Sequence, residues 1–234
     1  MLEAIANSQH PLSATEIAKY AKVNRSTSWR LLNTLEDFNY IKKNELTNLY
    51  SLSLGIWRLS QNMNLNQLVS KSRPVLEKIV KRTKGTAFLE IPVKGELVVI
   101  DECKSDNPIQ VDLAGIKVPL HCGSVGKLYL SSLPDIELEK FLDNKLESYT
   151  DFTITKKDIL RKQIQKIKKT GIAFNFKEHN EQWCGITSVV LDQSNRHFAY
   201  LNLTLPTYLI SEKELYSLKD LMYSSARDLE KKLK

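Results

Sequence analysis

The sequence predicts an α+β protein: a small helical unit at the N-terminus is followed by a larger unit in which strands and helices alternate. Two observations carry this prediction. Residues 1–63 read as short helices followed by a strand hairpin, the order of a winged helix-turn-helix domain, and a linker helix is expected at 64–72. Over 73–234, amphipathic helical segments alternate with strands. The 234 residues are enough for two modest domains.

The elements of the N-terminal unit follow from its capping and turn signals. Met1–Ala6 reads as the end of a helix. A capping-box pattern, Ser-Ala-Thr-Glu, predicts that a second helix starts at Ser13. Asn24 is a favourable N-cap and predicts a third helix that runs to about Asp37. Two short strands around a polar turn predict a hairpin over 40–52, and a further helix is expected from Leu54 to about Met63.

The third helix is predicted to have one apolar and one polar face. Helical spacing predicts that its large apolar residues face the core, namely Leu31, Leu32, Leu35 and Phe38. The opposite face then carries Arg25, Ser26, Trp29, Arg30 and Asn33. A helix that enters the major groove of DNA needs this division, because one face must anchor it while the other reads the bases.

Several side chains suit contacts with a DNA duplex. Arg30 can form two hydrogen bonds to a guanine edge, and the first turn of the helix offers amides to a phosphate. Lys42 and Lys43 at the hairpin base suit a wing that lies along phosphates. The residues expected to contact DNA are Thr15, Arg25, Ser26, Thr27, Trp29, Arg30, Asn33, Lys42, Lys43 and Asn48.

Charge alone does not settle the partner. The net charge of +7 favours a polyanionic partner such as nucleic acid, or reflects a solvated lysine-rich surface. Residues 1–63 hold only two of the seven excess positive charges, and many of the others lie in Lys156–Lys169. Two alternatives therefore remain open. The third helix is an ordinary surface helix whose Trp29 packs on a neighbouring domain, or the winged unit contacts protein rather than DNA.

The second unit is expected to be a sheet covered by helices. An amphipathic helix is predicted at Leu68–Lys84. Strands are predicted at Thr86–Val93, Glu96–Glu102, Ile109–Leu113, Gly185–Leu191 and His197–Leu205. Helices are predicted at Gly123–Leu133, Asp135–Leu142 and Thr155–Thr170, and a last helix begins with a capping box at Ser211.

Composition and motifs exclude several classes of protein. The hydrophobic fraction of 42% and the charged fraction of 26% are those of a globular chain. Three cysteines give no disulfide framework, and no apolar stretch is long enough to span a bilayer, so we expect a cytoplasmic protein that does not contact membranes. No P-loop, GxGxxG fingerprint or nucleophile elbow occurs, so neither an enzyme nor a cofactor is expected.

The histidines and cysteines suggest two further hypotheses, a metal site and a catalytic site. Structural zinc sites usually show closely paired ligands such as CxxC, and none occurs, so no metal is expected. Whether Cys122, His179 and Cys184 converge on a metal is left open by the sequence. A Cys–His hydrolase built on His121 and Cys122 is disfavoured, because adjacent residues seldom face each other productively.

Three stretches resemble the IclR family of transcription regulators. Residues 12–18, LSATEIA, are similar to the first helix of its helix-turn-helix. Residues 24–35, NRSTSWRLLNTL, resemble its recognition helix, with Ser28 where the family usually has valine. Residues 120–127, LHCGSVGK, resemble its LHxTAxGK stretch, whereas Gly185 begins a segment in which relatives often have CxAAPV.

This resemblance implies a second domain of GAF-like fold, in which a curved antiparallel sheet holds a small-molecule effector, expected to be an organic or aromatic acid. It also implies a homodimer or homotetramer that binds a palindromic double-stranded operator. Carried over position by position, the effector-binding candidates are Cys122, Gly123, Ser124, Val125, Glu178, Gly185, Asn202 and Thr204.

Overall fold

The computed structural model of the chain describes residues 1–61, 65–106 and 118–233. It divides the chain into two compact units, Met1–Asn66 and Gln67–Lys234. The α+β organisation expected from the sequence is confirmed. Residues 65–72 of the linker helix expected at 64–72 belong to a longer helix, α5 (Leu65–Thr83), and residue 64 lies outside the described residues.

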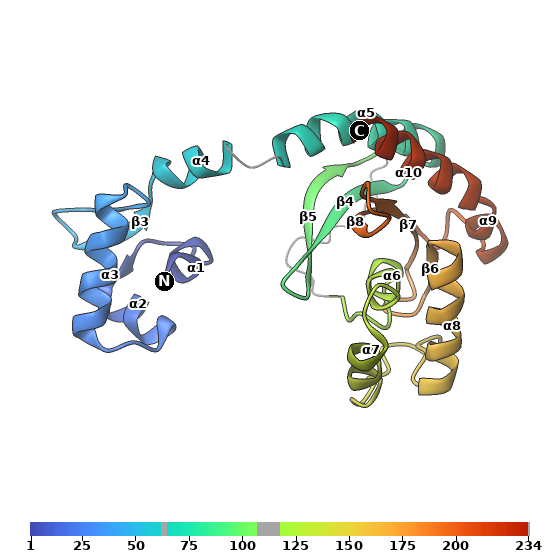
Figure 1. Cartoon of the computed structure of the whole chain (residues 1–234), viewed down its shortest axis with the longest axis horizontal. Helices are drawn as coiled ribbons and strands as arrows, with labels where there is room; N and C mark the ends of the chain where they lie inside the picture. The colour runs from blue at the N-terminus through green and yellow to red at the C-terminus, as the bar shows by residue number, and fades with distance from the viewer. Residues whose placement is uncertain (62–64, 107–117, 234) are drawn as a thin grey trace. The chain divides into compact units, whose positions relative to one another are not determined.

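The first unit is a winged helix-turn-helix (Figure 1). Its three strands form an antiparallel sheet in the order β1-β3-β2. Ile5, Ile17, Leu32, Ile41 and Tyr50 form its core, one from each of its first three helices and one from each strand of its hairpin. The elements are α1 (Leu2–Ala6), β1 (Leu12–Ser13), α2 (Ala14–Ala21), α3 (Arg25–Asp37), β2 (Ile41–Lys43), β3 (Leu49–Leu52) and α4 (Leu54–Gln61).

The inward face of α3 differs from the one predicted. Ser28 and Leu32 are the buried residues of this helix, whereas Leu31 is 42% exposed and Phe38 is 63% exposed. The prediction that Leu31 and Phe38 face the core is therefore wrong. Leu31 lies one residue, or about 100°, away from the inward position at Leu32. Phe38 is the C-cap, beyond the last helical residue, and its ring stacks on Tyr40 at a centroid distance of 5.7 Å.

The second unit contains one five-stranded sheet in the order β5-β4-β8-β7-β6, with every neighbouring pair antiparallel. Its strands are β4 (Thr86–Val93), β5 (Glu96–Cys103), β6 (Ile172–Phe176), β7 (Trp183–Leu191) and β8 (His197–Pro206). Its further helices are α6 (Ser124–Leu130), α7 (Asp135–Leu142), α8 (Lys157–Thr170), α9 (Glu212–Ser217) and α10 (Lys219–Leu233).

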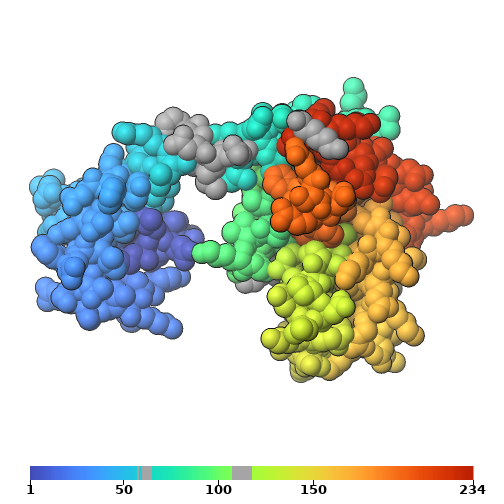
Figure 2. Space-filling model, viewed as in Figure 1, coloured from blue at the N-terminus to red at the C-terminus, as the bar shows by residue number. Residues whose placement is uncertain are grey.

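Helices cover both faces of this sheet. Figure 1 shows α5 and α10 together on one side and α6, α7 and α8 on the other. Lys78 of α5 pairs with Asp228 of α10, with Nζ 3.3 Å from Oδ2. On the other side, leucines and isoleucines of α6, α7 and α8 pack against the sheet residues Ala173, Val189 and Tyr200. The atoms of α7 and α8 lie side by side in the space-filling view (Figure 2).

The strand at Ile172–Phe176 was not predicted, and neither was the short β1. The helix expected at Gly123–Leu133 ends at Leu130, and the last helix is divided into α9 and α10 near Leu218. The strand predicted at Ile109–Leu113 lies outside the described residues. No helix in the described ranges combines the length and apolar character needed to cross a membrane.

Candidate functional site

The outward face of α3 gathers the residues expected to contact DNA. Arg25, Trp29 and Arg30 are exposed on this helix, and Asn33 is half-buried one turn further on. Trp29 is 63% exposed, so its large apolar ring is left in solvent rather than packed within the first unit. With Ser28 and Leu32 buried beneath it, α3 has one anchored face and one polar, aromatic face.

The start of α3 is fixed by its N-cap. Oδ1 of Asn24 accepts a hydrogen bond from the backbone N–H of Thr27 (2.8 Å) and a second one from Oγ of Ser26 (3.0 Å). The cap therefore uses the amide of Thr27. The amides of Arg25 and Ser26 are the ones in the first turn that can receive a phosphate. Thr15, in the first turn of α2, is also exposed.

The wing is attached to the end of α3. Oε1 of Glu36 accepts a hydrogen bond from the backbone N–H of Lys43 (3.1 Å) in β2. Lys42 is exposed and Lys43 is half-buried. At the wing tip, the exposed Asn48 adopts a left-handed conformation with φ of 55°, which closes the turn before β3.

The second unit contains a cavity of about 820 Å³. It is bounded by one face of the sheet, by the start of α6 and by residues of the 175–183 segment. Its apolar wall is formed by Leu97, Val99, Val118, Pro119, Leu120, Val125, Tyr149 and Trp183. Its polar side chains are those of Glu90, Glu96, Ser124, Asn175, His179, Asn180, Asn202 and Thr204. A mostly apolar cavity with a few polar groups is the usual form of a small-molecule site.

Six of the eight residues expected at the effector site line this cavity: Gly123, Ser124, Val125, Gly185, Asn202 and Thr204. The other two do not. Cys122 is fully buried, and Oε1 of Glu178 lies 2.5 Å from Nζ of the buried Lys127. Gly185 leaves room beside α6, because a Cβ atom there would lie 3.1 Å from Oγ of Ser124.

A chain of hydrogen bonds crosses the sheet beside the cavity. Nδ2 of Asn202 donates to Oε1 of Glu90 (2.8 Å), so Oδ1 of Asn202 accepts from Oγ1 of Thr187 (3.1 Å). The hydroxyl of Thr187 then accepts from Oγ of Ser124 (2.8 Å). Because the proton of Ser124 is used in this way, its oxygen is left as a hydrogen-bond acceptor.

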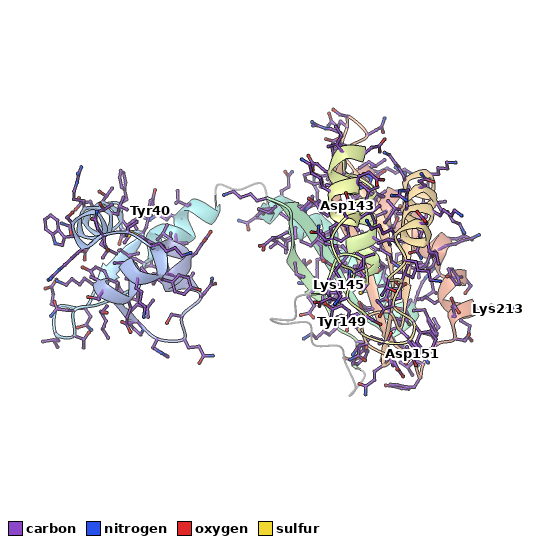
Figure 3. All side chains as sticks on the ribbon, turned by 90° about the horizontal axis from the view of Figure 1, so that it is seen from below. Tyr40, Asp143, Lys145, Tyr149, Asp151 and Lys213 are labelled. Carbon is purple, nitrogen blue, oxygen red and sulfur yellow. The ribbon has the colours of Figure 1, made fainter. Side chains whose placement is uncertain are left out.

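Sequence reasoning missed Glu90, Tyr149 and Trp183. A single charged residue within the apolar run Ala87–Ile91 was a signal for Glu90, because a charge in a buried strand needs a reason. Tyr149, labelled in Figure 3, comes from the loop between α7 and α8. The centroid of its ring lies 6.1 Å from that of His121 and 5.3 Å from that of His179. Such a long-range grouping leaves no local pattern in the sequence.

Cys122 and Cys184 lie buried, in surroundings that keep their thiols protonated. Burial raises the pKa of the Cys122 thiol to about 12 and that of the Cys184 thiol to about 12. Thiols with such pKa values hold their protons at neutral pH and are poor nucleophiles. Within 1–61, 65–106 and 118–233, no three histidine, cysteine or acidic side chains lie close enough together to hold a metal ion.

Comparison with known proteins identifies the family of both units. The model described as "IclR helix-turn-helix domain" matches residues 1–45, and the one described as "Bacterial transcriptional regulator IclR C-terminal" matches 61–231. The acetate operon repressor of Salmonella typhimurium is 24% identical over 241 residues, which cover 98% of this chain and 85% of the repressor.

Solved structures share the fold. An IclR transcriptional regulator from Alicyclobacillus acidocaldarius superposes with a TM-score of 0.79 at 20% identity, covering 99% of this chain and 94% of that one. An IclR homologue from Microbacterium hydrocarbonoxydans, solved in complex with 4-hydroxybenzoate, gives a TM-score of 0.81 at 18% identity, covering 99% and 95% of the two chains. With both of its units matched by the models of one family, the chain belongs to the IclR family of transcriptional regulators, which are not enzymes.

Proposed function

We propose that this regulator reads a palindromic operator through α3 and its wing, as a dimer or a dimer of dimers, and responds to a small organic acid. The observation that carries the DNA-reading part is the outward face of α3. Arg25, Trp29 and Arg30 are exposed there, while the opposite face is anchored in the core by Leu32. Two copies of such a helix would read two half-sites of an inverted repeat.

The cavity of the second unit is the proposed effector site. Its volume of about 820 Å³ is suitable for a small aliphatic or aromatic acid. Leu97, Val99 and Trp183 supply apolar surface for the carbon skeleton. A carboxylate would be received by Asn180 and His179 and by the backbone amides of Ser124 and Val125. The 4-hydroxybenzoate in the Microbacterium hydrocarbonoxydans homologue supports this class of ligand.

We assign the cytoplasm as the site of action, because the regulator must meet duplex DNA there.

Binding to the operator is expected to weaken steeply as the salt concentration rises, because lysine and arginine side chains displace counterions from the phosphates. Replacement of Lys43 on the wing is expected to lower the slope of log affinity against log salt by about one, the contribution of one phosphate contact.

The test begins with selection of duplexes from a random library by the purified chain. The selected sequences should contain an inverted repeat, and light scattering of the complex should give an even number of chains. Arg30→Ala is then expected to weaken binding to the selected duplex by about 1–3 kcal/mol, the scale of one lost base contact. Arg196→Ala is the matched control: it removes one exposed arginine from the β7–β8 turn of the second unit.

Three results would contradict this proposal. They are a library without enrichment, equal binding by Arg30→Ala and wild type, and a loss of binding in Arg196→Ala as large as that in Arg30→Ala. The first of these would instead favour the alternative in which the winged unit contacts protein through Trp29.

A further inference from the structure

Glu90 is a buried carboxyl group in the wall of the effector cavity. The residue is only 5% exposed and lines the cavity. It lies on β4, paired with Val99 of β5 on one side and with Tyr200 of β8 on the other. The neighbouring Leu89 is fully buried, and its side chain faces the opposite side of the sheet, because successive side chains of a strand alternate. The carboxyl group therefore faces the ligand space.

Among the residues that the structure describes, this carboxyl group has one hydrogen-bond partner and no counter-charge. Nδ2 of Asn202 donates to its Oε1 at 2.8 Å. Across the described ranges, Oε2 receives no hydrogen bond, and no lysine, arginine or histidine forms an ion pair with Glu90. Burial raises the pKa of Glu90 to about 7. A buried acid with a spare oxygen is costly unless another molecule completes its hydrogen bonds.

The orientation of Glu90 is fixed by the chain of hydrogen bonds behind it. Ser124 donates to Thr187, Thr187 donates to Asn202, and Asn202 donates to Glu90. The hydroxyl protons of Ser124 and Thr187 and one N–H of Asn202 are used within this series of hydrogen bonds, whereas the second N–H of Asn202 is not. Beside Glu90, two acceptors face the cavity: the oxygen of Ser124 and, when the carboxyl is ionised, Oε2 of Glu90. No lysine or arginine is among the described residues that line the cavity. This part of the wall is therefore suited to a hydrogen-bond donor.

We propose that Glu90 determines effector specificity by accepting a hydrogen bond from a hydroxyl or amino group of the effector. The effector is then a hydroxy- or amino-substituted monocarboxylic acid. Its carboxylate lies toward His179 and Asn180, and its donor group lies against Glu90. At this place, a second carboxylate would meet the two acceptors and no lysine or arginine of the described lining. The inference rests on the proposed function, since it names the class of acid that the same cavity takes.

The experiment is a calorimetric titration of the full chain at pH 8, where Glu90 is mostly ionised, with two matched series of acids. One series is benzoate, 4-hydroxybenzoate and terephthalate; the other is butyrate, 4-hydroxybutyrate and succinate. In at least one series the hydroxy acid is expected to bind about tenfold or more tightly than the unsubstituted acid, the usual effect of one hydrogen bond to a charged group. The dicarboxylate is expected to bind most weakly.

The variants test whether Glu90 causes this preference. Glu90→Val is expected to bring the hydroxy and unsubstituted acids within about twofold of each other, and Glu90→Gln to retain part of the difference. Glu137→Gln is the matched control, since it changes an exposed carboxyl of α7, which does not line the cavity, to an amide. It should keep the wild-type preference. Thermal melting of each variant shows that it folds.

Some outcomes would overturn the inference while leaving the proposed function intact. They are an unchanged preference in Glu90→Val, a dicarboxylate that binds more tightly than the hydroxy acid, and binding of unsubstituted acids only. If none of the acids binds, both the inference and the organic-acid effector fail. Operator reading is then still judged by Arg30→Ala, which does not depend on any ligand.

Discussion

Lys127 and Glu178 form an ion pair inside the effector unit, with Nζ 2.5 Å from Oε1 and the lysine side chain fully buried. Lys127 comes from α6, next to the cavity-lining residues at its start, and Glu178 comes from the segment that follows β6. Burial lowers the pKa of Lys127 and raises that of Glu178, because each charge loses its hydration. The pair thus joins two sides of the cavity at a point behind its wall.

Breaking this pair is expected to destabilise the chain strongly. Glu178→Gln leaves the buried ammonium of Lys127 without a counter-charge, which typically costs about 3–5 kcal/mol. The double variant Lys127→Met with Glu178→Leu should recover most of this loss, because no buried charge remains. Urea unfolding followed by circular dichroism measures both changes.

The control for this prediction is the exposed pair between Lys157 and Asp143; Asp143 is labelled in Figure 3. Asp143→Asn should leave the unfolding midpoint nearly unchanged, since solvent screens exposed charges. If Glu178→Gln unfolds at the same urea concentration as wild type, the ion pair does not hold the cavity together.

Glu90 is expected to make stability depend on pH in the acidic range. Its pKa is about 7 in the folded chain and near the ordinary value of 4.5 in the unfolded chain. Between these values the unfolded chain has released the proton that the folded chain retains. The free energy of unfolding therefore falls as pH rises from about 4.5 to about 7, by up to about 3 kcal/mol, and is then constant for this group.

The measurement compares wild type with Glu90→Gln at several pH values between 4.5 and 8. Burial lowers the pKa of His179 and of His197, which gives a slope of opposite sign below about 6.5. Both proteins contain these histidines. The difference between their free energies of unfolding at each pH therefore reports on Glu90 alone. If this difference in free energy does not change between pH 4.5 and 8, the carboxyl of Glu90 titrates in the folded chain as it does in water.

The order of the helices and strands could be predicted from local sequence signals such as helix caps. The set of residues that gather at each site could not. Capping boxes at Ser13 and Ser211 predicted the starts of α2 and α9, and both boxes are formed. The strand β6 was missed because the short run Ile172–Phe176 owes its conformation to pairing with β7. Such pairing depends on residues distant in sequence.

The orientation of side chains was harder to predict than the elements themselves. In α3, the apolar spacing suggested Leu31 as an inward residue, yet the small polar Ser28 occupies that face with Leu32. In the cavity, Gly123 and Asn202 were expected from the family resemblance, whereas Glu90 departs from an apolar strand pattern. Only the register of β4 against β8 brings its carboxyl to Asn202.

Ser28 gives a third prediction, on the stability of the DNA-reading unit. It is 2% exposed, and its Oγ has no hydrogen-bond partner in the described structure. Ser28→Ala removes an unsatisfied hydroxyl and favours the helix, so the free energy of unfolding should rise by about 1 kcal/mol.

Thermal melting of Ser28→Ala and of the control Ser26→Ala checks this. Ser26 is exposed, and its hydroxyl donates to the N-cap Asn24. Replacement of Ser26 by alanine should give no comparable rise in melting temperature. A lower melting temperature for Ser28→Ala would mean that the buried hydroxyl has a partner, such as a bound water, that stabilises α3.

The last prediction concerns how the cavity communicates with α5, the helix in which the two units join. Glu90 pairs with Val99, but the preceding residue, Leu89, pairs with Asp101, so a bulge in β5 lies between them. The buried Asp101 forms an ion pair with Arg73 of α5, and Nη1 of Arg73 also donates to the carbonyl of Glu102 (2.7 Å). A ligand that moves this bulge would therefore act on α5.

Arg73→Ala is expected to weaken the coupling between effector and operator without removing either site. Couplings between two binding sites are typically about 1–3 kcal/mol. In the variant, the ratio of operator affinities with and without the tightest-binding acid should approach one, while calorimetry still detects the acid. Lys78→Ala is the control, because it removes an exposed cation from the same helix. An Arg73→Ala chain with the wild-type ratio would show that the signal reaches α5 by another route.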